Sequence, residues 1–141
     1  MPAADILAPL FALAAWTGLV LLLIPTVRVR SALRGQVRAD DFRHGESARV
    51  PPAVSLPNRN YMNLLELPVL FYVAGLILYV TGGAGELALG LAWAYVALRV
   101  LHSLVHLTYN HVLHRLGVFA LSNGVLVALW VVAGLHVWGG R

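Results

Sequence analysis

Two apolar stretches of the chain decide its fold: residues 60–80, NYMNLLELPVLFYVAGLILYV, and residues 86–110, ELALGLAWAYVALRVLHSLVHLTYN. Each is long enough to cross a bilayer as a helix, which takes about 20 mostly apolar residues. Each also carries a charge in its interior, Glu66 in the first stretch and Arg99 in the second. Because a charge near the bilayer centre costs at least about 2.5–3.5 kcal/mol, we expect both to serve a polar site.

The composition of the whole chain is that of an integral membrane protein. Of its 141 residues, 60% are hydrophobic and only 11% are charged, whereas soluble domains carry about 25% charged residues. Two further apolar runs, at residues 6–27 and 116–138, bring the predicted membrane spans to four. The first run is too long for a cleaved signal peptide, and no basic segment precedes it. The sequence therefore predicts an all-α fold, a four-helix membrane bundle that forms a single domain over residues 1–141.

The basic residues predict how the bundle is oriented. All of them are arginine, and most lie between spans one and two or between spans three and four: Arg28, Arg30, Arg34, Arg38, Arg43, Arg49, Arg59 and Arg115. The other side of the bundle holds only Arg141. The positive-inside rule then places the loop 28–59 in the cytoplasm and both termini outside. Anionic lipid headgroups are the simplest partner for these arginines, and four membrane spans argue against a nucleic-acid role.

The chain contains no cysteine. This absence excludes disulfides, thiolate metal sites and a cysteine nucleophile. Any sulfur chemistry must therefore use a sulfur atom that arrives with the substrate.

Polar side chains recur at helical spacing on spans two and three. Arg59, Asn63 and Glu66 share one face of span two, and Arg99, His102, His106 and Asn110 share one face of span three. A Glu66–Arg99 ion pair, within one chain or between chains, is the least costly way to keep both charges. Together with Arg28 and Arg115 at helix ends, these residues predict a cationic funnel that opens toward the cytoplasm.

Each of these features also has a simpler explanation. The Glu66–Arg99 pair could be purely structural, and arginines at helix ends commonly extend toward the membrane surface. His102 and His106 are spaced to bind a metal, but no third ligand accompanies them. A haem site is disfavoured, because His136 and His102 are predicted to lie about half a membrane apart.

Two motifs resemble those of a known family. They are Asn63-Leu-Leu-Glu66-Leu-Pro68 on span two and Arg99-Val-Leu-His102-Ser-Leu-Val-His106 on span three, with Arg115 sixteen residues after Arg99. They are similar to signatures of the MAPEG superfamily, the membrane-associated proteins in eicosanoid and glutathione metabolism. Val27-Arg28-Val29-Arg30 and Arg43-His44-Gly45 resemble the prostaglandin E synthase branch of that superfamily. The similarity covers essentially the whole chain, which resembles a bacterial member.

This resemblance implies a homotrimer with glutathione, the co-substrate, bound between subunits near the cytoplasmic leaflet. Arg115 matches the arginine that holds the thiolate and is the expected catalytic residue. The resemblance implies that Arg28 of one subunit binds glutathione together with four residues of the next subunit: Asn63, Glu66, His102 and His106. The charge pattern adds Arg59 and Arg99 to the expected glutathione-binding residues. The predicted location is the bacterial inner membrane, with both termini periplasmic.

The implied activity is that of a glutathione-dependent transferase, peroxidase or isomerase that acts on a lipophilic electrophile. Glutathione carries two carboxylates and one ammonium group, which suit several arginines and one glutamate. Two departures from the family pattern stand out. His106 replaces a common tyrosine, and Leu116 and Phe119 stand where the prostaglandin branch has hydroxyl side chains. The alternative is therefore a non-catalytic membrane protein of the same fold that binds lipid or a partner.

Overall fold

The fold is entirely helical over the residues that a computed structural model of the chain describes, 3–139. Arg141, the arginine predicted for the opposite side of the membrane, lies outside the described residues. The elements in chain order are the short 3₁₀ helix η1 (Ala3–Ile6), α1 (Leu7–Leu33), the 3₁₀ helix η2 (Ala39–Phe42), α2 (Pro52–Leu65), α3 (Pro68–Val80), α4 (Glu86–Leu107) and α5 (Val112–Trp138).

Four segments within the described part are long and apolar enough to cross a membrane: Ala3–Leu33, Pro52–Val80, Glu86–Leu107 and Val112–Trp138. The prediction of an all-α, four-span membrane protein is thus confirmed. The helices extend beyond the apolar runs, because α1 continues to Leu33 and α2 already begins at Pro52. Proline suits the first helical turn, where its missing N–H has no partner to lose. The polar connection between these helices is correspondingly shorter than residues 28–59.

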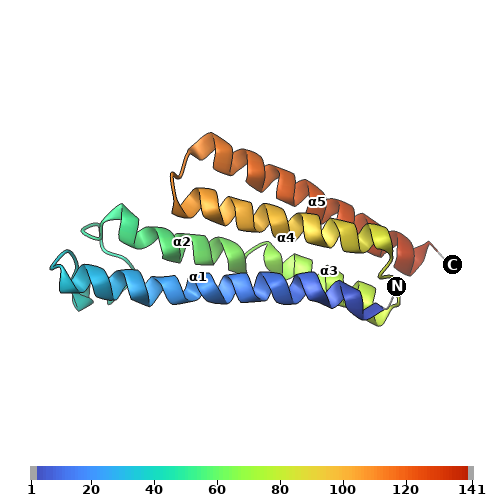
Figure 1. Cartoon of the computed structure of the whole chain (residues 1–141), viewed down its shortest axis with the longest axis horizontal. Helices are drawn as coiled ribbons and strands as arrows, with labels where there is room; N and C mark the ends of the chain where they lie inside the picture. The colour runs from blue at the N-terminus through green and yellow to red at the C-terminus, as the bar shows by residue number, and fades with distance from the viewer. Residues whose placement is uncertain (1–2, 140–141) are drawn as a thin grey trace.

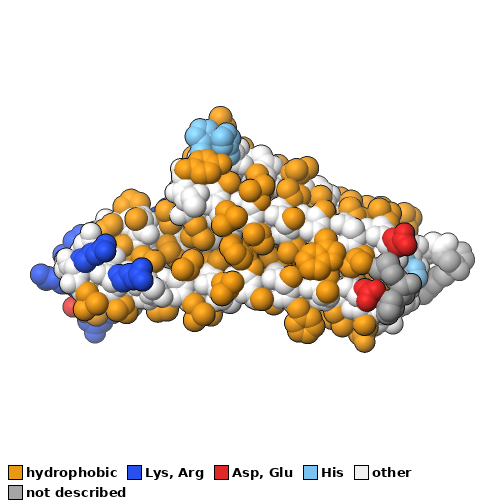
Figure 2. Space-filling model, viewed as in Figure 1, with side chains coloured by type: hydrophobic (Ala, Val, Ile, Leu, Met, Phe, Trp, Pro, Cys, Tyr) orange, Lys and Arg blue, Asp and Glu red, His pale blue; other side chains and the backbone are white. Residues whose placement is uncertain are grey.

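The helices lie roughly side by side along one long axis (Figure 1). α1 runs beside α2 and α3, while α4 and α5 form an antiparallel pair against them. α1 and α2 extend well past the connection between α4 and α5, so the loop after α1 stands out beyond the rest of the bundle (Figure 1). Figure 2 shows arginine side chains gathered at this end and hydrophobic side chains over the middle of the molecule.

The second span is broken where α2 gives way to α3. Glu66 follows the last residue of α2 with φ −82° and ψ −99°, outside the helical region, and Pro68 begins α3. Pro68 has no N–H to donate to a carbonyl one turn earlier. The last carbonyl groups of α2 are consequently left without helical partners.

The half of the bundle beyond this break has an apolar core. The rings of Phe71 on α3 and Tyr95 on α4 stack 4.6 Å apart between centroids, and both side chains are fully buried. A Cβ on Gly75 would lie 2.6 Å from Leu10 Cδ1, so glycine is required where α3 meets α1. Small residues let membrane helices approach closely, which replaces the hydrophobic driving force that lipid cannot provide.

The loop between α1 and α2 is ordered by a single carboxylate. Asp41 accepts hydrogen bonds from the Arg38 backbone N–H (2.9 Å) and the Ser47 hydroxyl (3.0 Å), and Arg49 lies 3.6 Å away. These partners lower the pKa of Asp41 below its usual value, the Arg38 and Ser47 hydrogen bonds contributing most. Nearby, Arg28 pairs with Glu46 at 3.0 Å and lies 4.3 Å from the centre of the Phe42 ring.

Candidate functional site

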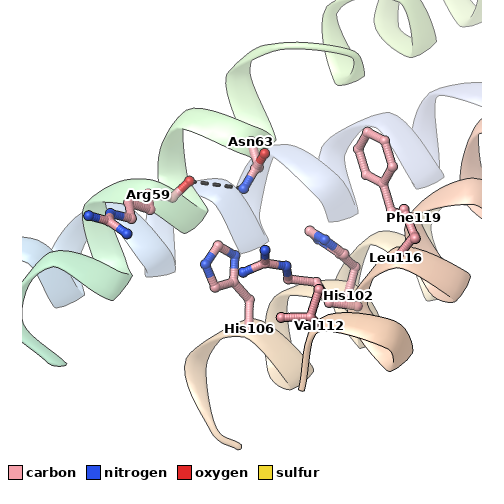
Figure 3. A pocket seen from close by; sticks show the side chains of 8 residues that line it. Arg59, Asn63, His102, His106, Val112, Leu116 and Phe119 are labelled. Atoms are coloured by element: carbon pink, nitrogen blue, oxygen red, sulfur yellow. Dashed lines mark hydrogen bonds between the residues drawn. The ribbon is translucent and has the colours of Figure 1, made fainter. Parts of the chain in front are cut away.

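A pocket of about 400 Å³ opens between α2, α4 and the start of α5, on the arginine-rich side of the break (Figure 3). Two polar residues of α2 face two histidines of α4 across it, and α5 supplies one arginine and an apolar wall. The lining residues are Arg59, Asn63, His102, His106, Val112, Arg115, Leu116 and Phe119.

The α2 wall presents Arg59 and Asn63, which lie one helical turn apart. The Asn63 side-chain amide donates to the Arg59 carbonyl oxygen at 3.1 Å (Figure 3). Arg59 itself is exposed, and its guanidinium appears in neither of the two ion pairs found among residues 3–139. It is therefore available to an anionic group in the pocket.

The α4 wall presents His102 and His106, each only 3% exposed. Their ring centres are 6.0 Å apart, and the Nδ1 atom of each ring has no hydrogen-bond partner within the described part of the chain. Buried polar atoms are normally paired. These two nitrogens are therefore candidates for contacts with a bound molecule.

The α5 wall presents Arg115, which is held by Asn110. Arg115 Nη1 donates to Asn110 Oδ1 at 2.9 Å. The sequence pattern placed Asn110 on the polar face of the third span, which is wrong: α4 ends at Leu107, and Asn110 lies beyond it with φ 47°. Asparagine tolerates this left-handed conformation better than most residues. Asn110 thus orients Arg115 from the loop rather than lining the helix.

A buried amide–hydroxyl pair fixes α2 against α4 beside the pocket. Asn60 Nδ2 donates to Ser103 Oγ at 2.8 Å, the Ser103 hydroxyl lies 3.0 Å from Asn60 Oδ1, and both side chains are fully buried. The pair holds the Arg59–Asn63 turn of α2 at a set distance from the His102–His106 turn of α4. The sequence did not predict this pair, because nothing in the spacing of the two residues shows that they meet.

Arg99 lies behind the pocket rather than in its wall. The residue is fully buried, and its Nη2 donates to the Asn63 backbone carbonyl, one of those freed by the break after α2. The guanidinium carbon is 5.6 Å from the centre of the Phe119 ring, within cation–π range. The Nε and Nη1 atoms of Arg99 have no hydrogen-bond partner among residues 3–139.

The predicted Glu66–Arg99 ion pair does not form within the chain. Among residues 3–139 the ion pairs are Arg28–Glu46 and Arg49–Asp41, and Glu66 is exposed at the break. The physical reason is that the broken helix offers Arg99 a carbonyl oxygen, so the guanidinium does not need the carboxylate. A contact of Glu66 with a second chain stays a prediction.

The pocket brings together Arg59, Asn63, His102, His106 and Arg115 out of the predicted site residues. It does not include Arg28, which is engaged by Glu46, nor Glu66 and Arg99. Val112 was not anticipated, because an aliphatic residue at the start of an apolar helix gives no signal. Within residues 3–139 there is no group of three or more side chains that could hold a metal ion.

Comparison with protein families finds one match: the family model described as MAPEG family matches residues 6–135 of the chain. This range contains all four spans apart from the outermost residues of the first and last. Comparison with curated proteins and with solved structures gives no match.

Proposed function

The chain belongs to the MAPEG family, and from that premise we propose that it is a glutathione-dependent membrane enzyme. It conjugates, reduces or isomerises a lipophilic electrophile with a glutathione thiolate formed in the pocket of α2, α4 and α5. The observation that carries the proposal is the charge of this pocket: its lining holds two arginines, two histidines and no carboxylate.

The charges of glutathione match the side chains around the pocket. Its two carboxylates suit Arg59 and Arg115, because a guanidinium donates paired hydrogen bonds to a carboxylate. Its ammonium group suits the carboxylate of Glu66, which is exposed at the nearby break. Asn63, His102 and His106 supply neutral polar contacts, and the unpaired Nδ1 atoms of the two histidines support this role.

Arg115 is the proposed catalytic residue. A free thiol has a pKa of about 8.5, and a guanidinium beside the sulfur lowers it by stabilising the thiolate. Each unit of lowering corresponds to about 1.4 kcal/mol. Val112, Leu116 and Phe119 support this effect, because an apolar wall strengthens the attraction between the two charges. In a conjugation, the thiol proton passes to bulk water and the thiolate sulfur forms a bond to the electrophilic carbon. The bond from that carbon to its halogen or epoxide oxygen breaks, and the electron pair leaves with the halide or stays on the oxygen, which then takes up a proton from water.

The complete site, in this proposal, spans two subunits of a homotrimer. Arg28 of one subunit approaches the pocket of the next and binds a glutathione carboxylate. Its guanidinium pairs with the partly buried carboxylate of Glu46 within the chain, so binding glutathione exchanges one carboxylate partner for another. The lipid phase delivers the hydrophobic substrate from the side.

We further propose that the protein resides in a bacterial inner membrane with the pocket facing the cytoplasm. The asymmetry of arginine between the two ends of the bundle supports this orientation (Figure 2). Both termini are then periplasmic.

Calorimetry in detergent tests the proposal. The wild-type protein should bind glutathione, and Arg115→Ala should weaken binding by roughly 10-fold or more, as expected for a charge-assisted hydrogen bond. The ultraviolet absorbance of bound thiolate should disappear in the same variant and partly return in Arg115→Lys. Arg34→Ala, in the exposed loop, is the matched control. Absence of binding at millimolar glutathione would refute the proposal.

The second candidate is a non-catalytic protein of the same fold. Leu116 and Phe119 support it, because they provide no hydroxyl donor for a thiolate. It requires that the purified protein turn over none of a panel of halogenated aromatics, epoxides and lipid hydroperoxides. One authentic turnover that is lost in Arg115→Ala would exclude it.

A further inference from the structure

A second groove lies on the outside of the α4–α5 pair, away from the glutathione pocket. It measures about 440 Å³ and is lined mainly by aliphatic side chains: Leu101, Val105, Leu113, Gly117, Val118 and Leu121, with Tyr109 and His114 at one end. It shares no residue with the pocket of Figure 3. On α5 the two sets of residues occupy opposite faces at helical spacing.

The groove has a polar end where α4 passes into α5. The Tyr109 hydroxyl lies 3.2 Å from His114 Nδ1, and the rings of His111 and His114 are 4.4 Å apart. All three side chains are exposed. Figure 2 shows histidine side chains standing together over the start of α5, directly beside hydrophobic ones. The end of the groove thus carries O–H and N–H donors at the level where a bilayer changes from hydrocarbon to headgroup.

Within the described residues, the groove has no acidic side chain near it that would repel an anion. Glu86, at the far end of α4, is the last acidic residue of the sequence. The ionisable side chains of the α4–α5 connection and of the first turn of α5 are therefore histidine, tyrosine and arginine. Arg115 turns the other way, into the glutathione pocket.

We propose that this groove binds an anionic phospholipid. One acyl chain lies between Leu101, Val105 and Leu121, and the phosphate accepts a hydrogen bond from His111. His114 hydrogen-bonds to a headgroup hydroxyl, which phosphatidylglycerol carries and phosphatidylcholine lacks. Tyr109 holds His114 in place through the 3.2 Å contact. The site is independent of the glutathione pocket, and it differs from ordinary lipid contact because it selects a headgroup.

Gly117 opens the floor of the groove. A Cβ placed on Gly117 would meet no atom within 4 Å, so a larger side chain fits without disturbing the helices and fills the space instead. Gly90, on α4 outside the groove, is equally open. The two glycines therefore provide a variant that blocks the groove, Gly117→Leu, and a matched control that leaves it open, Gly90→Leu.

The experiment is native mass spectrometry of the full chain after incubation with equal amounts of phosphatidylglycerol and phosphatidylcholine. Wild-type protein and Gly90→Leu should retain more phosphatidylglycerol, by about five-fold for one net hydrogen bond of roughly 1 kcal/mol. Gly117→Leu should lose the retained lipid. The double variant His111→Ala/His114→Ala, altered only at exposed positions, should still retain lipid but without preference for the anionic one.

Three results of the lipid-retention measurement would overturn the proposal. They are equal retention of both lipids by the wild type, a Gly117→Leu profile identical to that of Gly90→Leu, and unchanged preference in the double histidine variant. A change of oligomeric mass in Gly117→Leu would also overturn it, since the groove would then be a contact between subunits.

Discussion

The two halves of the bundle use the same long helices but bury different side chains. The half on the side of the arginine-rich loop comprises α2, residues 99–107 of α4 and residues 112–122 of α5. It buries Asn60, Arg99, His102 and Ser103. The other half comprises α3, residues 86–98 of α4 and residues 123–138 of α5. Its core is apolar, with Phe71 against Tyr95 and Leu78, Ala88, Leu129 and Ala133 around them.

The boundary between the halves coincides with the break in the second span. At that point Arg99 donates to the freed carbonyl of Asn63 and lies against Phe119. One guanidinium thereby contacts the α2 and α5 sides of the pocket from a position on α4. The comparison teaches that the apolar half joins the helices through hydrophobic contacts, whereas the polar half joins them through hydrogen bonds and places polar side chains around a pocket.

The largest effect is expected from a cavity in the apolar half. Phe71→Ala should lower the free energy of unfolding by about 3 kcal/mol, the low end of the range for buried aromatics, because lipid rather than water solvates the separated helices. Dodecyl sulfate unfolding of purified protein measures it. Glutathione affinity should stay within about two-fold of wild type, because the ring lies beyond the break. A large loss of affinity at unchanged stability would contradict the division into two halves.

The next largest effect is expected at the boundary, from Arg99→Met. Methionine fills much of the space but leaves the Asn63 carbonyl unpaired, which costs about 1–3 kcal/mol locally. Because a buried charge is removed at the same time, overall stability should change little. Amide hydrogen exchange around residues 62–68 should rise, and glutathione affinity should fall by roughly 10-fold.

Arg99→Lys provides the rescue for this variant. Its ammonium group can donate to the same carbonyl, so exchange at the break should return toward the wild-type rate. Unchanged exchange and affinity in Arg99→Met would mean that Arg99 does not organise the site.

A smaller effect is expected from the Asn60–Ser103 pair. Either Asn60→Ala or Ser103→Ala should cost about 1 kcal/mol, since each leaves a buried polar partner unsatisfied. The double variant should cost less than the sum of the two, because it removes both groups. A double-mutant cycle on unfolding free energy measures the coupling. Strict additivity would show that the pair contributes nothing to the contact of α2 with α4.

The smallest effect is expected outside both halves, at Asp41. Its pKa in the folded loop is lowered below the ordinary value of 3.8, so the ionised carboxylate stabilises the loop above about pH 4. This contribution is lost as the pH falls through the lowered pKa. Asp41→Asn should therefore loosen the loop at pH 7, and the difference from wild type should shrink as the pH falls below 3.8 through the lowered pKa. The backbone amide signals of Arg38 and Ser47 report it. A difference that does not change with pH in an acid titration would contradict the assignment.

The sequence predicted the four spans because hydropathy over some twenty residues depends only on composition. It also identified five residues that line the pocket, since polar side chains on one helix face must avoid lipid. It did not predict the partner of Arg99, because the Asn63 carbonyl is freed by the backbone conformation at the break after α2. Asn110 was misplaced for a similar reason, as helix α4 ends one residue after its last buried histidine, His106. The contact of Arg28 with the site of a neighbouring subunit stays a prediction, and within the chain its side chain is paired with Glu46.

The most direct test of the account is a structure of the protein determined in lipid nanodiscs with glutathione present. The account predicts density for the tripeptide against Arg59, Asn63 and Arg115, with its sulfur beside the Arg115 guanidinium and Arg28 reaching it from a neighbouring subunit. Density for glutathione elsewhere, or an empty pocket at a saturating concentration, would contradict the central claim that the polar half of the bundle is a glutathione site.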